Sequence, residues 1–134
     1  MLAVNPNSSG SDTIRPTVLV AEDEAMVRTV IVQMLRKLGY NVLSANDGDD
    51  AIEVFNQHAE EIKLVIFDMT MPTMSGEELF INLKQLSPQV KTLLTSGHHE
   101  QDMIDSLKNK GLSGFLPKPF NMAEMQGILS DILA

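Results

Sequence analysis

The chain has 134 residues, of which 43% are hydrophobic, with no cysteine and a formal net charge of −8. This length predicts one domain with a real core, and the lack of cysteine excludes disulfides and thiolate metal sites. The acidic balance argues against nucleic acid as a direct partner, since its phosphates require Lys and Arg. Neither a membrane-spanning stretch nor a signal peptide is apparent, so we expect a cytoplasmic protein that does not bind membranes.

The first segment, residues 1–15, is rich in Asn, Ser, Gly and Asp and shows no periodicity. We interpret it as a flexible arm or the remnant of a linker. Residues 16–134 are expected to form the single domain.

From Pro16 onward, apolar runs typical of buried strands alternate with apolar stripes at helical spacing. We expect strands at 17–21, 41–45, 63–67, 90–95 and 114–116. We expect helices at 24–38, 51–59, 75–87, 100–110 and 121–132. Ser75 with Glu78 forms a capping box, and Asn121 with Glu124 indicates another N-terminal cap. Five strands alternating with five helices favour an α/β fold, a parallel sheet with helices on both faces and right-handed crossovers.

Polar residues follow four of the five expected strands. They are Glu22-Asp23 after the first strand, Asp68 after the third, Thr95-Ser96-Gly97 at the fourth and Lys118 after the fifth. The carboxyl ends of parallel strands meet at one edge, where open α/β sheets bind their ligands. We therefore expect three carboxylates, a hydroxyl and an ammonium group to converge there.

Three neighbouring carboxylates repel one another unless a cation compensates their charge. All-oxygen ligation of this kind suits Mg²⁺, which uses one or two carboxylates together with phosphate oxygens. A metal, a lysine and a hydroxyl around Asp68 form an arrangement for phosphoryl transfer with the carboxylate as the nucleophile.

Four motifs together resemble the receiver domain of two-component response regulators, in the expected order along residues 16–134. They are Val18-Leu19-Val20-Ala21-Glu22-Asp23-Glu24, Asp68 followed by Met71-Pro72 and Gly76, Leu94-Thr95-Ser96-Gly97, and Phe115-Leu116-Pro117-Lys118-Pro119-Phe120. The resemblance implies a doubly wound, flavodoxin-like (βα)5 fold with strand order 2-1-3-4-5.

The same resemblance implies roles for individual residues. Asp68 would accept a phosphoryl group from a histidine kinase or a histidine phosphotransfer protein. Lys118 would pair with Asp68 and then with its phosphate. Mg²⁺ (or Mn²⁺) would be held by the following groups: the carboxylates of Glu22, Asp23 and Asp68, and the backbone carbonyl of Thr70.

Further positions would govern switching and the lifetime of the phosphoryl group. Ser96 would be the switch hydroxyl; Thr95 competes for this role, but Gly97 after Ser96 leaves room for a phosphoryl group. Phe115 stands where the family places a switching aromatic, here without the hydroxyl of the more frequent tyrosine. Thr70 and His98 occupy positions that tune dephosphorylation by water.

Each motif also has a simpler local interpretation. Glu22-Asp23-Glu24 could cap the first helix, Lys118 could be a solvated loop lysine, and Ser96 could be a turn residue. His98-His99 lacks a third ligand, so we do not expect a transition-metal site there. The nine methionines are expected mostly at core-facing helical positions, while Met69, Met71 and Met74 could partly cover the site of Asp68.

Rival functions are less consistent with these residues. A haloacid dehalogenase-type phosphatase needs a second acid where this chain has Thr70. A flavodoxin-like FMN binder needs a phosphate-binding loop where this chain has Glu22-Asp23-Glu24. A receiver-like scaffold that is never phosphorylated is a further alternative. We expect a signalling phosphoacceptor with at most weak autophosphatase activity, and not an enzyme in the usual sense.

The surface of residues 100–133 is expected to change its affinity for a downstream protein or a second copy upon phosphorylation. The chain could be a stand-alone regulator, part of a longer response regulator, or the C-terminal receiver of a hybrid histidine kinase.

Overall fold

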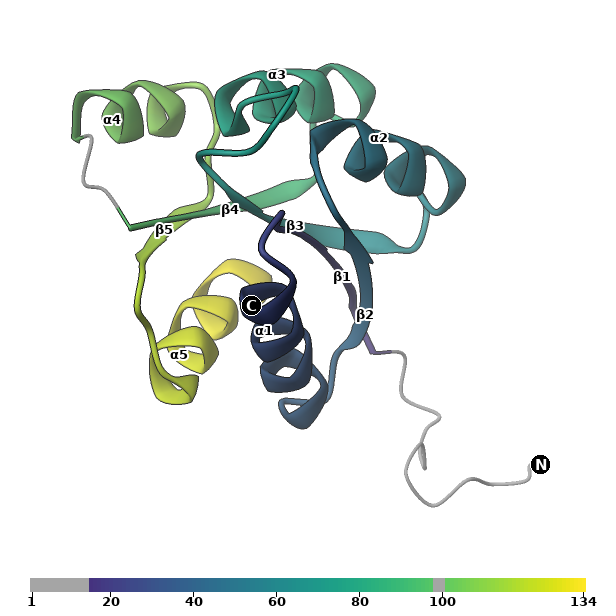
Figure 1. Cartoon of the computed structure of the whole chain (residues 1–134), viewed down its shortest axis with the longest axis vertical. Coiled ribbons are helices and arrows are strands. Elements are labelled where there is room, and N and C mark those ends of the chain that lie inside the picture. Colours follow the sequence, from purple (N-terminus) through teal and green to yellow (C-terminus); the bar gives the residue numbers. More distant parts are fainter. Residues whose placement is uncertain (1–14, 98–100) are drawn as a thin grey trace.

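The computed structural model describes residues 15–97 and 101–134. The predicted arm, apart from Arg15, and the pair His98-His99 therefore lie outside the described residues. A central sheet is covered by helices on both faces (Figure 1). Its strands are β1 (Thr17–Ala21), β2 (Asn41–Ala45), β3 (Ile62–Asp68), β4 (Lys91–Ser96) and β5 (Gly114–Pro117). The helices are α1 (Ala25–Lys37), α2 (Gly48–Gln57), α3 (Gly76–Leu86), α4 (Gln101–Asn109) and α5 (Met122–Leu133).

All ten predicted elements are present, and the largest difference concerns the start of α2. This helix begins at Gly48 and not at residue 51, because the Asp47 side chain accepts a hydrogen bond from the Asp50 N–H at 2.8 Å. That contact is an N-terminal cap, which the apolar periodicity alone did not reveal. The capping box of Ser75 and Glu78 is confirmed at the start of α3.

The five strands form one parallel sheet in the order β2-β1-β3-β4-β5, which confirms the predicted α/β architecture. The register aligns the carboxyl ends of the inner strands. Ala21 lies opposite Phe67, Asp68 opposite Thr95, and Ser96 opposite Pro117. Residues that directly follow β1, β3, β4 and β5 therefore meet at one edge of the sheet.

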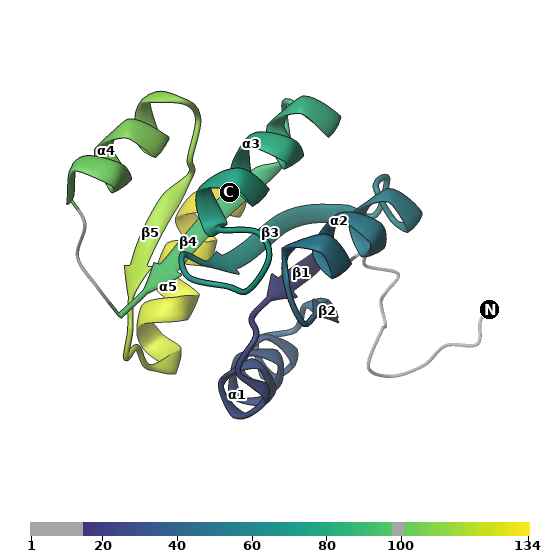
Figure 2. The same cartoon turned by 45° about the horizontal axis from the view of Figure 1, so that its top comes forward.

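Two hydrophobic cores lie on the two faces of the sheet. Helices α2, α3 and α4 cover one face, and helices α1 and α5 cover the other (Figures 1 and 2). The first core includes Phe55, Phe67 and Phe80, and the second includes Leu35 and Leu129. Strand residues alternate between the two cores, as the pleat of a doubly covered sheet requires.

The methionines do not all follow the expectation that they pack in the core. Met125 of α5 is fully buried, but Met26 of α1 is 83% exposed and Met122 is 37% exposed. Met69 and Met71 are buried in the core beneath α2 and α3. No helix among the described residues has the length and apolar character needed to cross a membrane.

Gly76, at the start of α3, lies close to the main chain of the residue that ends β3. A Cβ atom at this position would lie 2.7 Å from the Asp68 carbonyl oxygen and 2.8 Å from the Met69 Cα. The Gly76 N–H donates to the Met69 carbonyl oxygen at 2.8 Å. A side chain here would have to displace backbone, so glycine allows α3 to begin directly beside Asp68.

The opposite edge, where the strands begin, carries a separate hollow of about 280 Å³. Pro16, just before β1, and Ala134, just after α5, both line it, together with Lys63 and Lys91 at the starts of β3 and β4. Both ends of the described chain therefore lie at the edge opposite the carboxyl ends of the strands.

Candidate functional site

Side chains from four strand ends line a cavity of about 370 Å³ at the carboxyl edge of the sheet. Its lining consists of Asp23, Glu24, Asp68, Thr70, Ser96, Gly97 and Lys118. These residues come from positions that are far apart in the sequence. The parallel register brings them together, as expected from the sequence.

Lys118 connects two of the carboxylates. Its Nζ lies 2.8 Å from Asp68 Oδ1 and 2.9 Å from Glu22 Oε1. The Glu22 side chain is only 2% exposed and that of Asp68 11%, whereas that of Lys118 is 20% exposed. A contact this close and this buried is not consistent with a solvated loop lysine.

Burial raises the pKa of Glu22, and the hydrogen bond and positive charge of Lys118 offset only part of that effect. The negative charge of Asp68 raises the pKa of Glu22 further. For Lys118, burial alone would lower the pKa, but the hydrogen bonds to Asp68 and Glu22 outweigh it and the pKa is raised. The lysine is therefore held in its charged form by the two acids.

Glu22, Asp23 and Asp68 each place a carboxylate oxygen within 4.8 Å of the others. Glu22 and Asp68 are buried, while Asp23 is exposed at the mouth of the site. A cluster of carboxylate oxygens of this size fits a hard divalent cation that keeps part of its water shell, as Mg²⁺ does. The residues present are thus a suitable ligand set for the predicted metal.

The carboxylate of Asp68 is oriented by groups on both of its oxygens. Lys118 contacts Oδ1, and the backbone N–H of Thr70 donates to Oδ2 at 3.2 Å. The adjacent Met69 N–H donates to the Thr95 carbonyl oxygen at 3.1 Å, which ties the end of β3 to β4. These contacts fix the position of the carboxylate relative to the strand ends.

The two candidate hydroxyl groups occupy different places. Ser96 lines the cavity together with Asp68 and Lys118. The Thr95 Oγ1 instead donates to the backbone carbonyl oxygen of Phe67 at 3.4 Å, a long contact within the sheet. This arrangement favours Ser96 as the hydroxyl that could reach a group on Asp68.

Of the other residues expected to tune the switch, some line the cavity and others do not. Gly97 lines the cavity, and a Cβ atom there would meet nothing within 4 Å, so the space beside it is open. Phe115 is half-buried against the core beneath α2, α3 and α4. Thr70 is exposed and lines the cavity, whereas His98 lies outside the described residues. No methionine is among the residues that line this cavity.

The acidic segment does not cap the first helix through the side chain of its N-cap residue. Glu24 is the N-cap residue of α1, but its side chain makes no capping hydrogen bond. The Glu24 N–H donates at 3.3 Å to the Oε2 of Glu22, whose Oε1 contacts Lys118.

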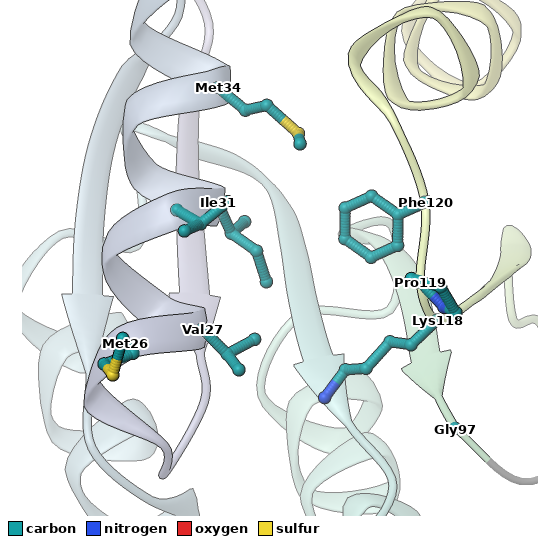
Figure 3. Close-up of a pocket in the computed structure, with 9 residues that line it drawn as sticks. Met26, Val27, Ile31, Met34, Gly97, Lys118, Pro119 and Phe120 are labelled. Carbon is teal, nitrogen blue, oxygen red and sulfur yellow. The ribbon is translucent and has the colours of Figure 1, made fainter.

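An apolar groove of about 540 Å³ adjoins the polar cavity and was not anticipated from the sequence (Figure 3). It lies between α1 and the segment that follows β5. Its lining consists of Met26, Val27, Val30, Ile31, Met34, Gly97, Lys118, Pro119 and Phe120. Met26 is 83% exposed and Val30 52% exposed. Their spacing with Met34, four residues apart, was the sequence signal for a second apolar stripe on α1.

Three kinds of comparison with known proteins agree. The family model for the response regulator receiver domain matches residues 18–130. The chain is 35% identical to the autoinducer 1 sensor kinase/phosphatase LuxN of Vibrio campbellii over 88% of its own length and 14% of that protein. It is 34% identical to the sensor kinase CckA of Brucella abortus over 87% of its length and 12% of that protein. The chain thus spans a small part of these relatives.

A solved structure shows the same architecture. The signal receiver domain of a putative Luxo repressor protein from Vibrio parahaemolyticus has a TM-score of 0.80 and 28% sequence identity. The comparison covers 89% of this chain and 90% of that one.

Removing the ammonium group of Lys118 should destabilise the metal-free protein in a pH-dependent way. In Lys118→Met the pKa of Glu22 should rise further, because the contacts with Lys118 lower it. When the pKa of a carboxyl group is higher in the folded than in the unfolded protein, ionisation of that group destabilises the fold. The destabilisation sets in as the pH rises above about 4.5, the ordinary pKa of Glu, and is complete above the raised pKa of the folded protein. We expect little loss near pH 4 and a loss of about 2 kcal/mol at pH 7, measured by urea unfolding without divalent cations.

The exposed Lys108 in the last turn of α4 provides the control, since Lys108→Met removes a charge that does not line the cavity. An equal loss of stability for Lys118→Met at both pH values would contradict the assigned role of the ion pair.

Proposed function

The chain belongs to the response regulator receiver domain family, and on this premise we propose that Asp68 accepts a phosphoryl group from a phosphohistidine donor. The observation that carries the proposal is the placement of Asp68 between Lys118 and two further acids at the carboxyl edge of the sheet. Phosphorylation would then act as a switch for interaction with other proteins. The donor would be a histidine kinase or a histidine phosphotransfer protein.

In the proposed reaction an oxygen of the Asp68 carboxylate attacks the phosphorus atom in line with the donor imidazole. The new O–P bond forms as the N–P bond of the phosphohistidine breaks, and the leaving imidazole nitrogen takes a proton from water. Lys118 lies close enough to Asp68 to follow the negative charge as it spreads over the phosphoryl oxygens. Its raised pKa keeps it positively charged for this task.

Glu22, Asp23 and Asp68 would hold Mg²⁺, and the backbone carbonyl of Thr70 remains the proposed fourth ligand from the protein. The bound metal would neutralise charge on the transferring phosphoryl group. The clustering of the three carboxylates supports this assignment. Asp23 is the exposed member of the three acids and would be the metal ligand nearest to solvent.

Ser96 would then move toward the phosphoryl group, and Phe115 would change its packing against the core. Ser96 is the last residue of β4, which precedes α4 in the chain, and Phe115 lies in β5, which precedes α5. The surface of residues 100–133 is therefore where we propose that the affinity for a downstream protein or a second copy changes. Thr70, Gly97 and His98 remain proposed tuning positions for dephosphorylation.

We further propose that the donor docks over the apolar groove of α1. The groove shares Gly97 and Lys118 with the polar cavity, so a protein that brings a histidine to Asp68 must also cover part of it. The exposed side chains of Met26 and Val30 suit an apolar helix face on that donor. The acidic balance of the chain continues to argue against nucleic acid as a direct partner.

The proposal favours a signalling phosphoacceptor in the cytoplasm, and the matches to sensor kinases favour a receiver that belongs to a hybrid kinase. A stand-alone regulator and a scaffold that is never phosphorylated are the alternatives. The complete acid set with its lysine argues against the scaffold.

The first test is chemical. Incubation with Mg²⁺ and a small phosphodonor such as phosphoramidate should add one phosphoryl group to the wild-type protein, detected by intact-protein mass spectrometry. Asp68→Asn should remain unlabelled, and omission of the metal should strongly slow the labelling. A variant lacking Asp68 that is labelled as fast as the wild type would reject Asp68 as the acceptor.

The second test separates the two hydroxyl groups. Ser96→Ala should retain phosphorylation of Asp68 but weaken the resulting change in hydrogen exchange over residues 101–133. Thr95→Ala should leave that change intact, because the Thr95 hydroxyl bonds within the sheet. The opposite pattern would assign the switch to Thr95.

The third test concerns the groove. Met26→Asp and Val30→Asp place charges on an apolar surface, so transfer from a histidine kinase that labels the wild type should fall at least about 10-fold. Labelling by phosphoramidate should stay within about 2-fold of wild type, because these side chains do not line the cavity. Met122→Asp, at an exposed methionine outside the groove, is the control. Unchanged transfer from the kinase would place donor docking elsewhere.

A further inference from the structure

The loop that carries Glu22 and Asp23 into α1 is anchored differently from the loops that enter three other helices. Helices α2, α3 and α5 each begin with a side chain that accepts a hydrogen bond from the helix backbone: Asp47, Ser75 and Asn121. Helix α1 has no such cap, because the side chain of its N-cap residue Glu24 makes no capping hydrogen bond. The Glu22 Oε2 accepts a hydrogen bond from the Glu24 N–H at 3.3 Å, and a second group contacts the main chain of this loop.

That group is Arg28, which lies within the second turn of α1. Its Nη1 donates to the backbone carbonyl oxygen of Glu22 at 2.7 Å, so its side chain folds back along the helix toward the strand end. The contact is short and charge-assisted, and Arg28 is half-buried.

The carbonyl that Arg28 contacts belongs to the peptide group between Glu22 and Asp23. The preceding peptide is fixed from the other direction, because the Glu22 N–H donates to the Ala45 carbonyl oxygen of β2 at 3.2 Å. The main chain on both sides of Glu22 is thus fixed, by β2 on one side and by Arg28 on the other. The directions of the two neighbouring acidic side chains depend on these two peptide planes.

We propose that Arg28 is a positioning residue for the metal site: it fixes the Glu22–Asp23 peptide so that both carboxylates converge with Asp68. This inference rests on the proposed function, since it concerns the metal that supports phosphorylation. Arg28 does not line the cavity and contacts none of the three carboxylates in the described hydrogen bonds. Its effect is exerted through the main chain of the ligand-bearing loop.

The sign of the effect distinguishes this role from a purely electrostatic one. Removing a positive charge near three carboxylates would, through charge alone, strengthen the binding of a divalent cation. Removing an anchor of the ligand loop would weaken it, and loss of contacts that orient metal ligands typically costs about 10- to 100-fold in affinity. A merely structural residue would lower the stability without changing the affinity.

The experiment measures Mg²⁺ affinity by isothermal titration calorimetry on the whole chain, with urea unfolding recorded in parallel. Arg28→Met keeps the apolar stem but removes the donors, and it should weaken Mg²⁺ binding by about 10-fold. Arg28→Lys keeps one charged donor on a shorter stem and should return the affinity to within about 3-fold of wild type. Arg36→Met, in the last turn of the same helix, is the matched control and should bind Mg²⁺ as wild type does.

If Arg28→Met does not fold, Arg28→Gln replaces it under the same expectation. Unchanged or tighter Mg²⁺ binding in the folded variant would overturn the inference, the first indicating a structural role and the second a role of charge alone. A wild-type chain that binds no Mg²⁺ would overturn both this inference and the metal-dependent part of the proposed function. Mg²⁺ binding that depends on Arg28 in a chain whose Asp68 is never labelled would overturn only the proposed function.

Discussion

The paired contact of Lys118 with Asp68 and Glu22 is the interaction on which the rest of the site depends. Two acids buried at neighbouring strand ends would repel each other, and the ammonium group between them makes that arrangement tolerable. It also links the end of β5 to the ends of β1 and β3. The backbone adds to this link, since the Lys118 N–H donates to the Ser96 carbonyl oxygen at 2.9 Å. Lys118 thus both neutralises the two acids and joins the end of β5 to the ends of β1, β3 and β4.

The fold and the polar site were predictable because both follow from short-range patterns. Apolar runs mark the strands, and a parallel sheet gathers whatever follows them, so Asp68 and Lys118 could be brought together without knowledge of any contact. The cap at Asp47 was missed because it is a single side-chain contact outside the apolar stripe. The spacing of Met26, Val30 and Met34 indicated an apolar stripe, but neither the groove that it lines nor the contact of Arg28 could be predicted. The groove depends on how α1 packs beside the segment after β5, and the Arg28 contact on the path of the loop before α1.

The site has two contrasting sides that share Lys118 and Gly97. On one side, charged groups converge on Asp68. On the other, apolar side chains of α1 lie across from Pro119 and Phe120 (Figure 3). The polar side suits small ions, for which charge and ligand geometry determine binding. The apolar side suits a protein, for which removal of apolar area from water contributes most. Substitutions in the apolar groove can therefore alter partner binding without altering the residues that surround Asp68, although the two surfaces adjoin.

The shared location of Pro16 and Ala134 at the edge where the strands begin has a consequence for how such a domain can be combined with others. The chain enters the described domain at Pro16 and leaves it at Ala134 on the side remote from Asp68, so these two points do not obstruct the carboxylates. The domain can accordingly be appended before or after other modules, or inserted between them, while its reactive edge stays accessible.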